Sequence, residues 1–153
     1  MQEAKAILEK YRGIKGLYLL LLHLEEGYYN IGKLYTGVLP SGTYAYIGSA
    51  WGPGGLDTRV SRHLSANKRI HWHIDWLTSD TRCKLIGVYL FPRVKGESEM
   101  YRILSKIGEC VILGFGSTDD RSSKCHLLLL KKSLKELEDV LQYFYLNYVK
   151  ILL

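Results

Sequence analysis

The chain has 153 residues, enough to bury a substantial core as one domain, and 47% of them are hydrophobic. No apolar run approaches the roughly 20 residues of a membrane-spanning helix, so no membrane is expected as a partner. The formal net charge is +6, which permits binding to a polyanion but does not demand it.

The cysteines and the N-terminal stretch bear on the cellular compartment. Cys83, Cys110 and Cys125 form no CxxC pair, and such an odd, sparse number argues against a disulfide scaffold. The first residues, MQEAKAILEKYRG, carry charges throughout, unlike a secretory signal. Together these features predict a cytoplasmic protein in a reducing environment.

In chain order, the first third of the sequence predicts a short helix followed by an antiparallel meander. Residues 3–11 suit a helix ended by Gly13, and the almost wholly apolar stretch 16–24 suits a buried central strand. Residues 28–38 contain an alternating segment typical of a further strand. A Pro-Ser-Gly turn then leads into a strand over 43–47.

The rest of the chain alternates helices and strands. Helices are predicted over 57–66, 71–79, 97–107 and 133–150, strands over 84–91 and 125–130, and a loop over 114–124. The helix over 71–79 is expected to pack Trp72, Trp76 and Leu77 inward, and the last helix begins with a capping box at Ser133. The fold class is therefore α+β, one domain over 1–153 with a small, mostly antiparallel central sheet flanked by helices. Its core spans about 14–131, and the helix over 133–150 packs against it.

The most informative stretch is 44–64, YAYIGSAWGPGGLDTRVSRHL. It predicts an aromatic strand, a glycine-rich loop and the opening of a basic helix. Tyr44 and Tyr46 share one face of the strand, while Arg59 and His63 are four residues apart on the helix. A cation and an imidazole beside a tyrosine-bearing strand can hold a phosphate.

Three motifs in this order resemble those of the GIY-YIG nuclease superfamily. They are Gly16-Leu17-Tyr18 on one strand, Tyr46-Ile47-Gly48 on the next, and Arg59-x-x-x-His63 on a helix. More narrowly, GSAxGPGGLxxRxxRHL, HWHIDWL and a late GFGS…CH segment resemble an uncharacterised prokaryotic branch, a domain of unknown function. The resemblance runs from about Gly16 to Leu130, and the whole chain is expected to form a GIY-YIG-like domain.

The resemblance implies an endonuclease that hydrolyses phosphodiester bonds in DNA, in repair or recombination. It implies duplex or structured DNA as the partner and one divalent ion, Mg²⁺ or Mn²⁺, as the cofactor. Members of the branch also occur fused to a base-excision-repair glycosylase of the endonuclease III type, so such a glycosylase is a further expected partner. These nucleases place a metal-binding glutamate on a later helix, and Glu99 is the corresponding expectation here.

The chemistry of the residues supports a catalytic set. Arg59 can hold a phosphate through two hydrogen bonds, and Glu99 offers the hard oxygen ligand that Mg²⁺ prefers. Tyr18 or Tyr46 could deprotonate the attacking water if an arginine and a metal favour the phenolate. His63 could orient that tyrosine or relay its proton.

A second set is expected to contact the nucleic acid. Glycines let a backbone come close, and the cations and imidazoles after the basic helix can reach phosphates. The set comprises Gly48, Gly54, Gly55, Arg62, Lys68, Arg69, His71 and His73. The glycine loop lacks GxxxxGK[ST], so it is no nucleotide-binding P-loop.

Each single residue also has a structural interpretation. One tyrosine among twelve is more often packing than catalysis, Arg59 is by default a surface cation, and Glu97 and Glu99 can simply favour a helix N-terminus. His71 and His73 are not cofacial on a helix, which favours a structural role or a phosphate contact over a metal site.

A weaker metal candidate is Cys125-His126 with Asp119 and Asp120, which lacks a second spaced pair.

Two departures from the superfamily pattern leave other functions open. Tyr18 and Tyr46 lie 28 residues apart (46 − 18), more than in the usual tight hairpin, so residues 25–42 are predicted to add a strand or a long hairpin. The asparagine usual after the glutamate is represented only by Asn147, on the predicted last helix. The alternatives are a nucleic-acid-binding module that has lost cutting and a purely structural or partner-binding domain.

Overall fold

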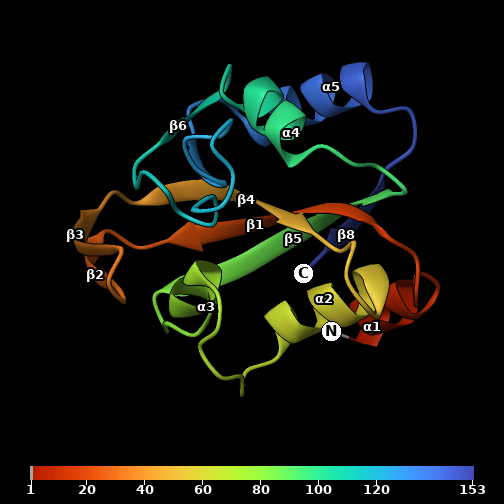
Figure 1. The fold of residues 1–153 in the computed structure, drawn as a ribbon, viewed down its shortest axis with the longest axis horizontal. Coiled ribbons are helices and arrows are strands. Elements are labelled where there is room, and N and C mark those ends of the chain that lie inside the picture. The colour runs from red at the N-terminus through yellow and green to blue at the C-terminus, as the bar shows by residue number, and fades with distance from the viewer. Residues whose placement is uncertain (1) are drawn as a thin grey trace.

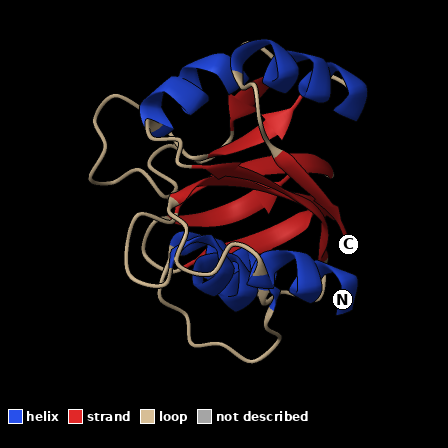
Figure 2. Cartoon of the chain, turned by 90° about the vertical axis from the view of Figure 1, so that its right-hand side faces the viewer, coloured by secondary structure: helices blue, strands red, loops and turns tan. Residues whose placement is uncertain are grey.

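The apolar run near the N-terminus forms β1 (Gly16–Leu24), the strand at the centre of the fold, in a computed structural model that describes residues 2–153. β1 pairs antiparallel with β4 (Gly42–Ser49) on one side and with β5 (Cys83–Pro92) on the other. Its first seven residues are buried because helices cover both faces of the sheet (Figure 2). The prediction of a buried central strand is confirmed.

The main sheet of residues 2–153 has six strands, all antiparallel, in the order β6-β7-β4-β1-β5-β8. The strands not yet named are β6 (Gly108–Cys110), β7 (Leu127–Leu130) and β8 (Val149–Leu152). A separate hairpin of β2 (Gly27–Ile31) and β3 (Tyr35–Leu39) projects at the left of Figure 1.

The predicted meander is wrong in this part of the chain. Residues 28–38 contribute to two strands outside the main sheet instead of one strand within it. The long-hairpin alternative for residues 25–42 is confirmed. Since the hairpin lies outside the main sheet, the two tyrosine-bearing strands β1 and β4 are direct neighbours.

Five helices in residues 2–153 form the outer layers. In Figure 1, α4 (Glu97–Leu104) and α5 (Leu134–Phe144) lie above the sheet, whereas α1 (Gln2–Glu9), α2 (Gly55–Leu64) and α3 (His73–Thr78) lie below it. The predicted α+β class, with helices flanking an antiparallel sheet, is confirmed.

The C-terminal region differs from its prediction. The Ser133 hydroxyl accepts a hydrogen bond from the Glu136 N–H at 3.2 Å, as a cap does, but the helix ends at Phe144 instead of residue 150. Residues 149–152 form β8, whose alternating Val149 and Ile151 pair with the edge of β5. Pairing at the edge of the sheet outweighs the helical pattern there. Asn147 therefore lies in a connection and not on a helix.

Trp76 also departs from its expected inward packing. Leu77 is fully buried and Trp72 half-buried, but Trp76 is 36% exposed. α3 is only six residues long, and Ile74 and Leu77 occupy its inward face. The Trp76 ring instead lies beside Gly32 of the hairpin.

The expectation of unpaired cysteines is wrong for Cys110 and Cys125, which form a disulfide with Cα atoms 6.0 Å apart. Cys110 ends β6 and Cys125 precedes β7, so the antiparallel pairing of these strands brings the two together. Cys83 is free. The pair removes one argument for a reducing compartment. Within residues 2–153, none of the helices is long and apolar enough to cross a membrane.

Candidate functional site

A pocket of about 730 Å³ opens where β4 continues past its pairing with β7. Its walls come from β1, β4, α2, α4, the start of α3 and the loop over residues 111–126 between β6 and β7. The lining residues with reactive or charged groups include Tyr18, Tyr46, Arg59, Glu97, Asp120 and His126. Four of the five predicted catalytic residues meet at or directly behind this pocket.

The two tyrosines reach the pocket because of the strand register. Tyr18 of β1 lies opposite Gly48 of β4, and Tyr46 lies two residues earlier on the same face. The Tyr18 ring crosses Gly48 so closely that a Cβ at this position would overlap the ring. The space next to Gly48 is thus filled by the Tyr18 ring, and any side chain at position 48 would displace that ring.

His63 lies directly behind Tyr18. The Tyr18 hydroxyl and His63 Nε2 are 2.6 Å apart, and both residues are buried. Burial lowers the pKa of His63 to about 3, so the imidazole is neutral at physiological pH. Its Nδ1 is buried with no hydrogen-bond partner in residues 2–153. His63 thus contacts the Tyr18 hydroxyl, but with this low pKa the imidazole is a weak base towards the Tyr18 proton.

Burial also controls the ionisation of the tyrosines. It raises the pKa of Tyr18 and that of Tyr46, and the opposing effect of Arg59 is smaller. Both hydroxyls are therefore protonated at neutral pH in the protein alone. Tyr46 is 8% exposed and Tyr18 only 1%, so Tyr46 is the more accessible to a ligand in the pocket.

Arg59 offers an uncompensated positive charge. Its guanidinium lies 4.4 Å from the centroid of the Trp72 ring, which holds the side chain against the pocket wall. Among residues 2–153, the ion pairs of arginines involve Arg12, Arg62 and Arg82, and none involves Arg59. This guanidinium is available to an anionic ligand.

The glycine-rich loop positions α2 rather than leaving space for a ligand. Gly55 is buried with φ +67°, and a Cβ there would overlap the backbone of residues 13–14. The Gly13 N–H donates to the Gly54 carbonyl at 3.1 Å, and the Leu56 N–H donates to the Ile14 carbonyl at 2.8 Å. Gly54 and Gly55 thus dock the start of α2 onto the segment before β1.

The glutamate in the pocket is Glu97, not the expected Glu99. Glu97 is the first residue of α4 and lines the pocket, whereas Glu99 is exposed and outside it. Glu99 lies near Tyr145, whose pKa is raised to about 12 by burial and by this carboxylate. A signal for Glu97 existed in the sequence, since Met100 and Leu104 follow it by three and seven residues on the inward face.

Three more residues with ionisable side chains line the pocket but were absent from the predicted catalytic set, namely Asp119, Asp120 and His126. His126 lies between two carboxylates, with Nδ1 3.4 Å from Glu97 Oε2 and Nε2 3.1 Å from Asp120 Oδ2. Burial raises the pKa of Glu97, His126 lowers it, and the charges of Asp120 and Asp119 raise it further. The sequence had suggested Cys125-His126 and the two aspartates only as a weak metal candidate.

Two of the expected DNA-binding cations are already engaged. Arg62 donates to both carboxylate oxygens of Asp75, at 2.9 and 2.8 Å, and also to the Arg69 carbonyl at 2.8 Å. Asp75 is fully buried and also accepts from the N–H groups of His71 and Trp72. The Lys68 ammonium donates to the carbonyls of residues 63 and 65. Arg62 and Lys68 therefore stabilise the turn before α3.

The other three side chains expected to contact the nucleic acid are those of Arg69, His71 and His73. Arg69 and His71 are exposed, and His71 lines the pocket. His73 also lines it, and its Nδ1 accepts a hydrogen bond from the Gly116 N–H at 2.9 Å. His73 thereby connects α3 to the loop over 111–126, in keeping with a structural role.

The donor set bears on the kind of metal that the pocket could hold. Residues 2–153 contain no cluster of three or more His, Cys, Asp or Glu side chains arranged to hold an ion. Glu97 with the nearby aspartates offers one or two carboxylates, the pattern by which Mg²⁺ is held while it keeps several waters. Burial is the largest cause of the raised pKa of Glu97, and the smaller repulsion from Asp120 and Asp119 would favour a cation there. These carboxylates are the side chains of the pocket that could hold a single Mg²⁺-type ion.

A comparison with known protein families identifies the family of this chain. Residues 17–146 match the family described as "Domain of unknown function DUF123". The chain belongs to this family. The match covers most of the fold, from β1 to the end of α5 with its connection, and so includes the whole pocket. Membership of DUF123 confirms the resemblance to an uncharacterised family, and the wider relationship to GIY-YIG nucleases stays a prediction. Neither the curated proteins nor the solved structures gave a match.

Proposed function

We propose that this DUF123 protein is a GIY-YIG-type endonuclease that uses one divalent ion, Mg²⁺ or Mn²⁺, to hydrolyse phosphodiester bonds in DNA. The observation that carries the proposal is the convergence of Tyr18, Tyr46, Arg59 and Glu97 from four different elements at one pocket. These groups match the needs of phosphodiester hydrolysis, namely water activation, phosphate charge neutralisation and a metal ligand.

Each side chain has a distinct role in the proposed reaction. The free guanidinium of Arg59 holds the phosphate, and Glu97 takes the role of metal ligand that the sequence had given to Glu99. The Tyr46 hydroxyl orients the attacking water, while Tyr18 and His63 fix the wall beside it. A bound divalent ion would supply the positive charge that polarises the phosphoryl oxygens and counters the raised pKa of the tyrosines.

A second candidate function is a nucleic-acid-binding module without cutting. Two observations favour it, the protonated state of both tyrosines in the protein alone and the position of Asn147 away from the pocket. In that case Arg59 and the exposed Arg69 and His71 would bind phosphates without hydrolysis. The glycosylase partner and the cytoplasmic location belong to both versions of the proposal.

The test is incubation of labelled duplex, branched and abasic DNA with the protein and Mg²⁺ or Mn²⁺, with a chelator as control. We expect cutting that the chelator abolishes and that Arg59→Ala reduces by at least about 100-fold, the usual cost of removing one charge-stabilising donor. Salt-sensitive binding without cutting would instead support the binding module. Absence of both would contradict the proposal.

A further inference from the structure

The loop over residues 111–126 forms one wall of the pocket and is fixed at three points. The Cys110–Cys125 disulfide closes its base. Phe115 at its middle is fully buried, with ring centroids 6.1 Å from Tyr46 and 5.6 Å from His73. The hydrogen bond from Gly116 to His73 ties the same part to α3. Such a wall is rigid enough to hold a side chain in one orientation.

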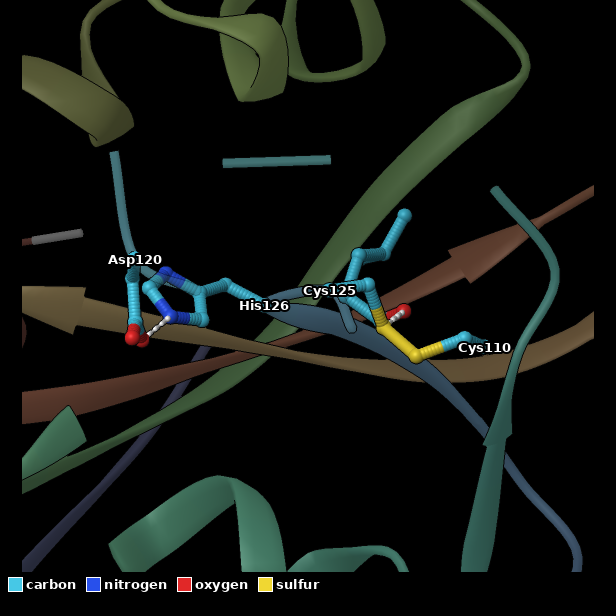
Figure 3. Close-up of a disulfide and its surroundings, with 5 residues drawn as sticks. Cys110, Asp120, Cys125 and His126 are labelled. Carbon is cyan, nitrogen blue, oxygen red and sulfur yellow. Dashed lines mark hydrogen bonds and ion pairs between the residues drawn. A yellow bond between two sulfur atoms is a disulfide. The ribbon is translucent and has the colours of Figure 1, made fainter. Parts of the chain in front are cut away.

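His126 is the residue that this wall presents to the pocket. Its backbone N–H donates to the Phe115 carbonyl, and its carbonyl accepts from the Ile47 N–H, both at 2.7 Å. These bonds fix the backbone to the loop on one side and to β4 on the other. Figure 3 shows the imidazole turned towards Asp120, whereas the sulfur of the preceding Cys125 points away towards Cys110. The side chain of His126 is 3% exposed.

The two ring nitrogens of His126 serve different carboxylates. Nδ1 faces Glu97 Oε2 at 3.4 Å, and Nε2 is within hydrogen-bond distance of Asp120 Oδ2 at 3.1 Å. Asp120 is itself held, because it accepts from the backbone N–H and the hydroxyl of Ser122 at 3.0 and 2.7 Å. A continuous chain of contacts therefore runs from Ser122 through Asp120 and His126 to Glu97.

We propose that His126 is a positioning residue of this site, which holds the Glu97 carboxylate in its orientation towards the pocket while Asp120 holds the other side of the His126 ring. Glu97 sits in the first turn of α4 and is only half-buried, so its carboxylate needs such a neighbour to keep one orientation. The inference rests on the proposed function in so far as Glu97 is taken as the metal ligand. It accounts for a buried histidine that the proposed reaction does not otherwise use.

Three substitutions of His126 distinguish the role of Nδ1 from the role of Nε2. Asparagine keeps a polar atom near the place of Nδ1, glutamine keeps one near the place of Nε2, and leucine keeps neither. We expect His126→Leu to weaken the binding of Mn²⁺ by about 10–100-fold, the usual cost of losing a neighbour that orients a ligand. His126→Asn should stay close to wild type, and His126→Gln should resemble His126→Leu.

The measurement is titration calorimetry of the full chain with Mn²⁺ alone, with thermal unfolding to confirm that each variant is folded. His23→Leu is the matched control, because His23 is exposed on β1 outside the pocket. Glu97→Gln should abolish the binding that His126→Leu weakens. If His126→Leu does not fold, the comparison of His126→Asn with His126→Gln gives the same test.

The inference and the proposed function can fail separately. Wild-type affinity in His126→Leu, rescue by glutamine but not by asparagine, or no Mn²⁺ binding at all would overturn the positioning role. Mn²⁺ binding that follows the expected order without any DNA cleavage would support the positioning role and contradict the nuclease. Metal-dependent cleavage with equal Mn²⁺ affinity in wild type and His126→Leu would contradict the positioning role and support the nuclease.

Discussion

The packing of Tyr18 over Gly48 is the contact that most directly sets the geometry of the pocket. The glycine in the Tyr-Ile-Gly triplet is needed because the opposite tyrosine ring occupies the space of its side chain. The two tyrosine triplets are thus linked by one steric relationship between neighbouring strands. It explains on physical grounds why the two short motifs occur together in this chain.

This relationship predicts the effect of Gly48→Ala. The added Cβ would overlap the Tyr18 ring, so we expect the free energy of unfolding to fall by about 1–3 kcal/mol, as for other overpacked cores. Gly87→Ala on β5 is the matched control, because its Cβ would meet the Ile151 carbonyl at 3.4 Å, an ordinary contact. Urea unfolding of both variants is the measurement. Equal effects of the two substitutions would contradict this description of the contact.

His63 predicts a pH dependence of stability. Its folded pKa of about 3 lies below the ordinary value of 6.5, so the unfolded chain binds the extra proton between these values. Stability should therefore fall as the pH drops through this window, with about 2 kcal/mol lost by pH 5. In His63→Gln the fall in unfolding free energy between pH 7 and pH 5 should be smaller by this amount.

The exposed His71 provides the control for this experiment, since His71→Gln leaves the buried His63 in place. Urea titrations at pH 7 and pH 5 measure the difference for each protein. A His63→Gln variant that is as acid-sensitive as wild type would show that His63 is not buried in its neutral form.

At the scale of elements, the disulfide that closes the loop over 111–126 is the least expected part of the structure. The disulfide joins positions 15 residues apart, and the chain-entropy argument gives about 3 kcal/mol for a loop of this length. Reduction should lower the free energy of unfolding of the wild type by this amount. It should leave Cys110→Ala unchanged, because that variant has already lost the bond.

Cys83→Ala is the control, and its sensitivity to the reductant should equal that of the wild type. Burial raises the pKa of the Cys83 thiol to about 12, so this cysteine should react slowly with alkylating reagents in the folded protein. Chemical unfolding with and without a phosphine reductant is the measurement. A wild type that is insensitive to the reductant would contradict the disulfide.

The elements also show what the sequence could and could not predict. The apolar run of β1 and the cap at Ser133 depend on local patterns, and both were predicted correctly. β8 and the disulfide depend on which strands pair across the sheet, and no local pattern contains that information. The choice between Glu97 and Glu99 was open to prediction, since the apolar stripe of α4 already separated the two faces.

At the scale of the whole molecule, the sheet brings together residues that are far apart in the sequence. The strands β1 and β4 carry the tyrosines, α2 carries Arg59, and α4 carries Glu97 from the opposite helical layer (Figures 1 and 2). The order of the motifs along the chain predicted most of this set. The sequence grouped His126 with Asp120 as a weak metal candidate, but their position beside Glu97 could not be predicted, because it depends on the fold of a loop without regular structure.

The net charge also has a different meaning once the fold is known. The chain carries +6, but Arg62 and Arg82 are paired with Asp75 and Asp80. Arg59 faces the pocket without an acidic partner in residues 2–153, so it contributes more to an anion site than its share of the net charge suggests. The position of single charges, not their sum, supports the proposed nucleic-acid substrate.

The central claim is that Glu97 is the glutamate of a metal-dependent nuclease site, and a matched pair of substitutions on one helix turn tests it most directly. The measurement is single-turnover cleavage of labelled DNA in Mn²⁺ by Glu97→Gln and Glu99→Gln, each compared with wild type. We predict that Glu97→Gln lowers the rate at least about 100-fold and that Glu99→Gln cleaves as the wild type does. Cleavage that survives Glu97→Gln, or that is lost in Glu99→Gln alone, would contradict the account.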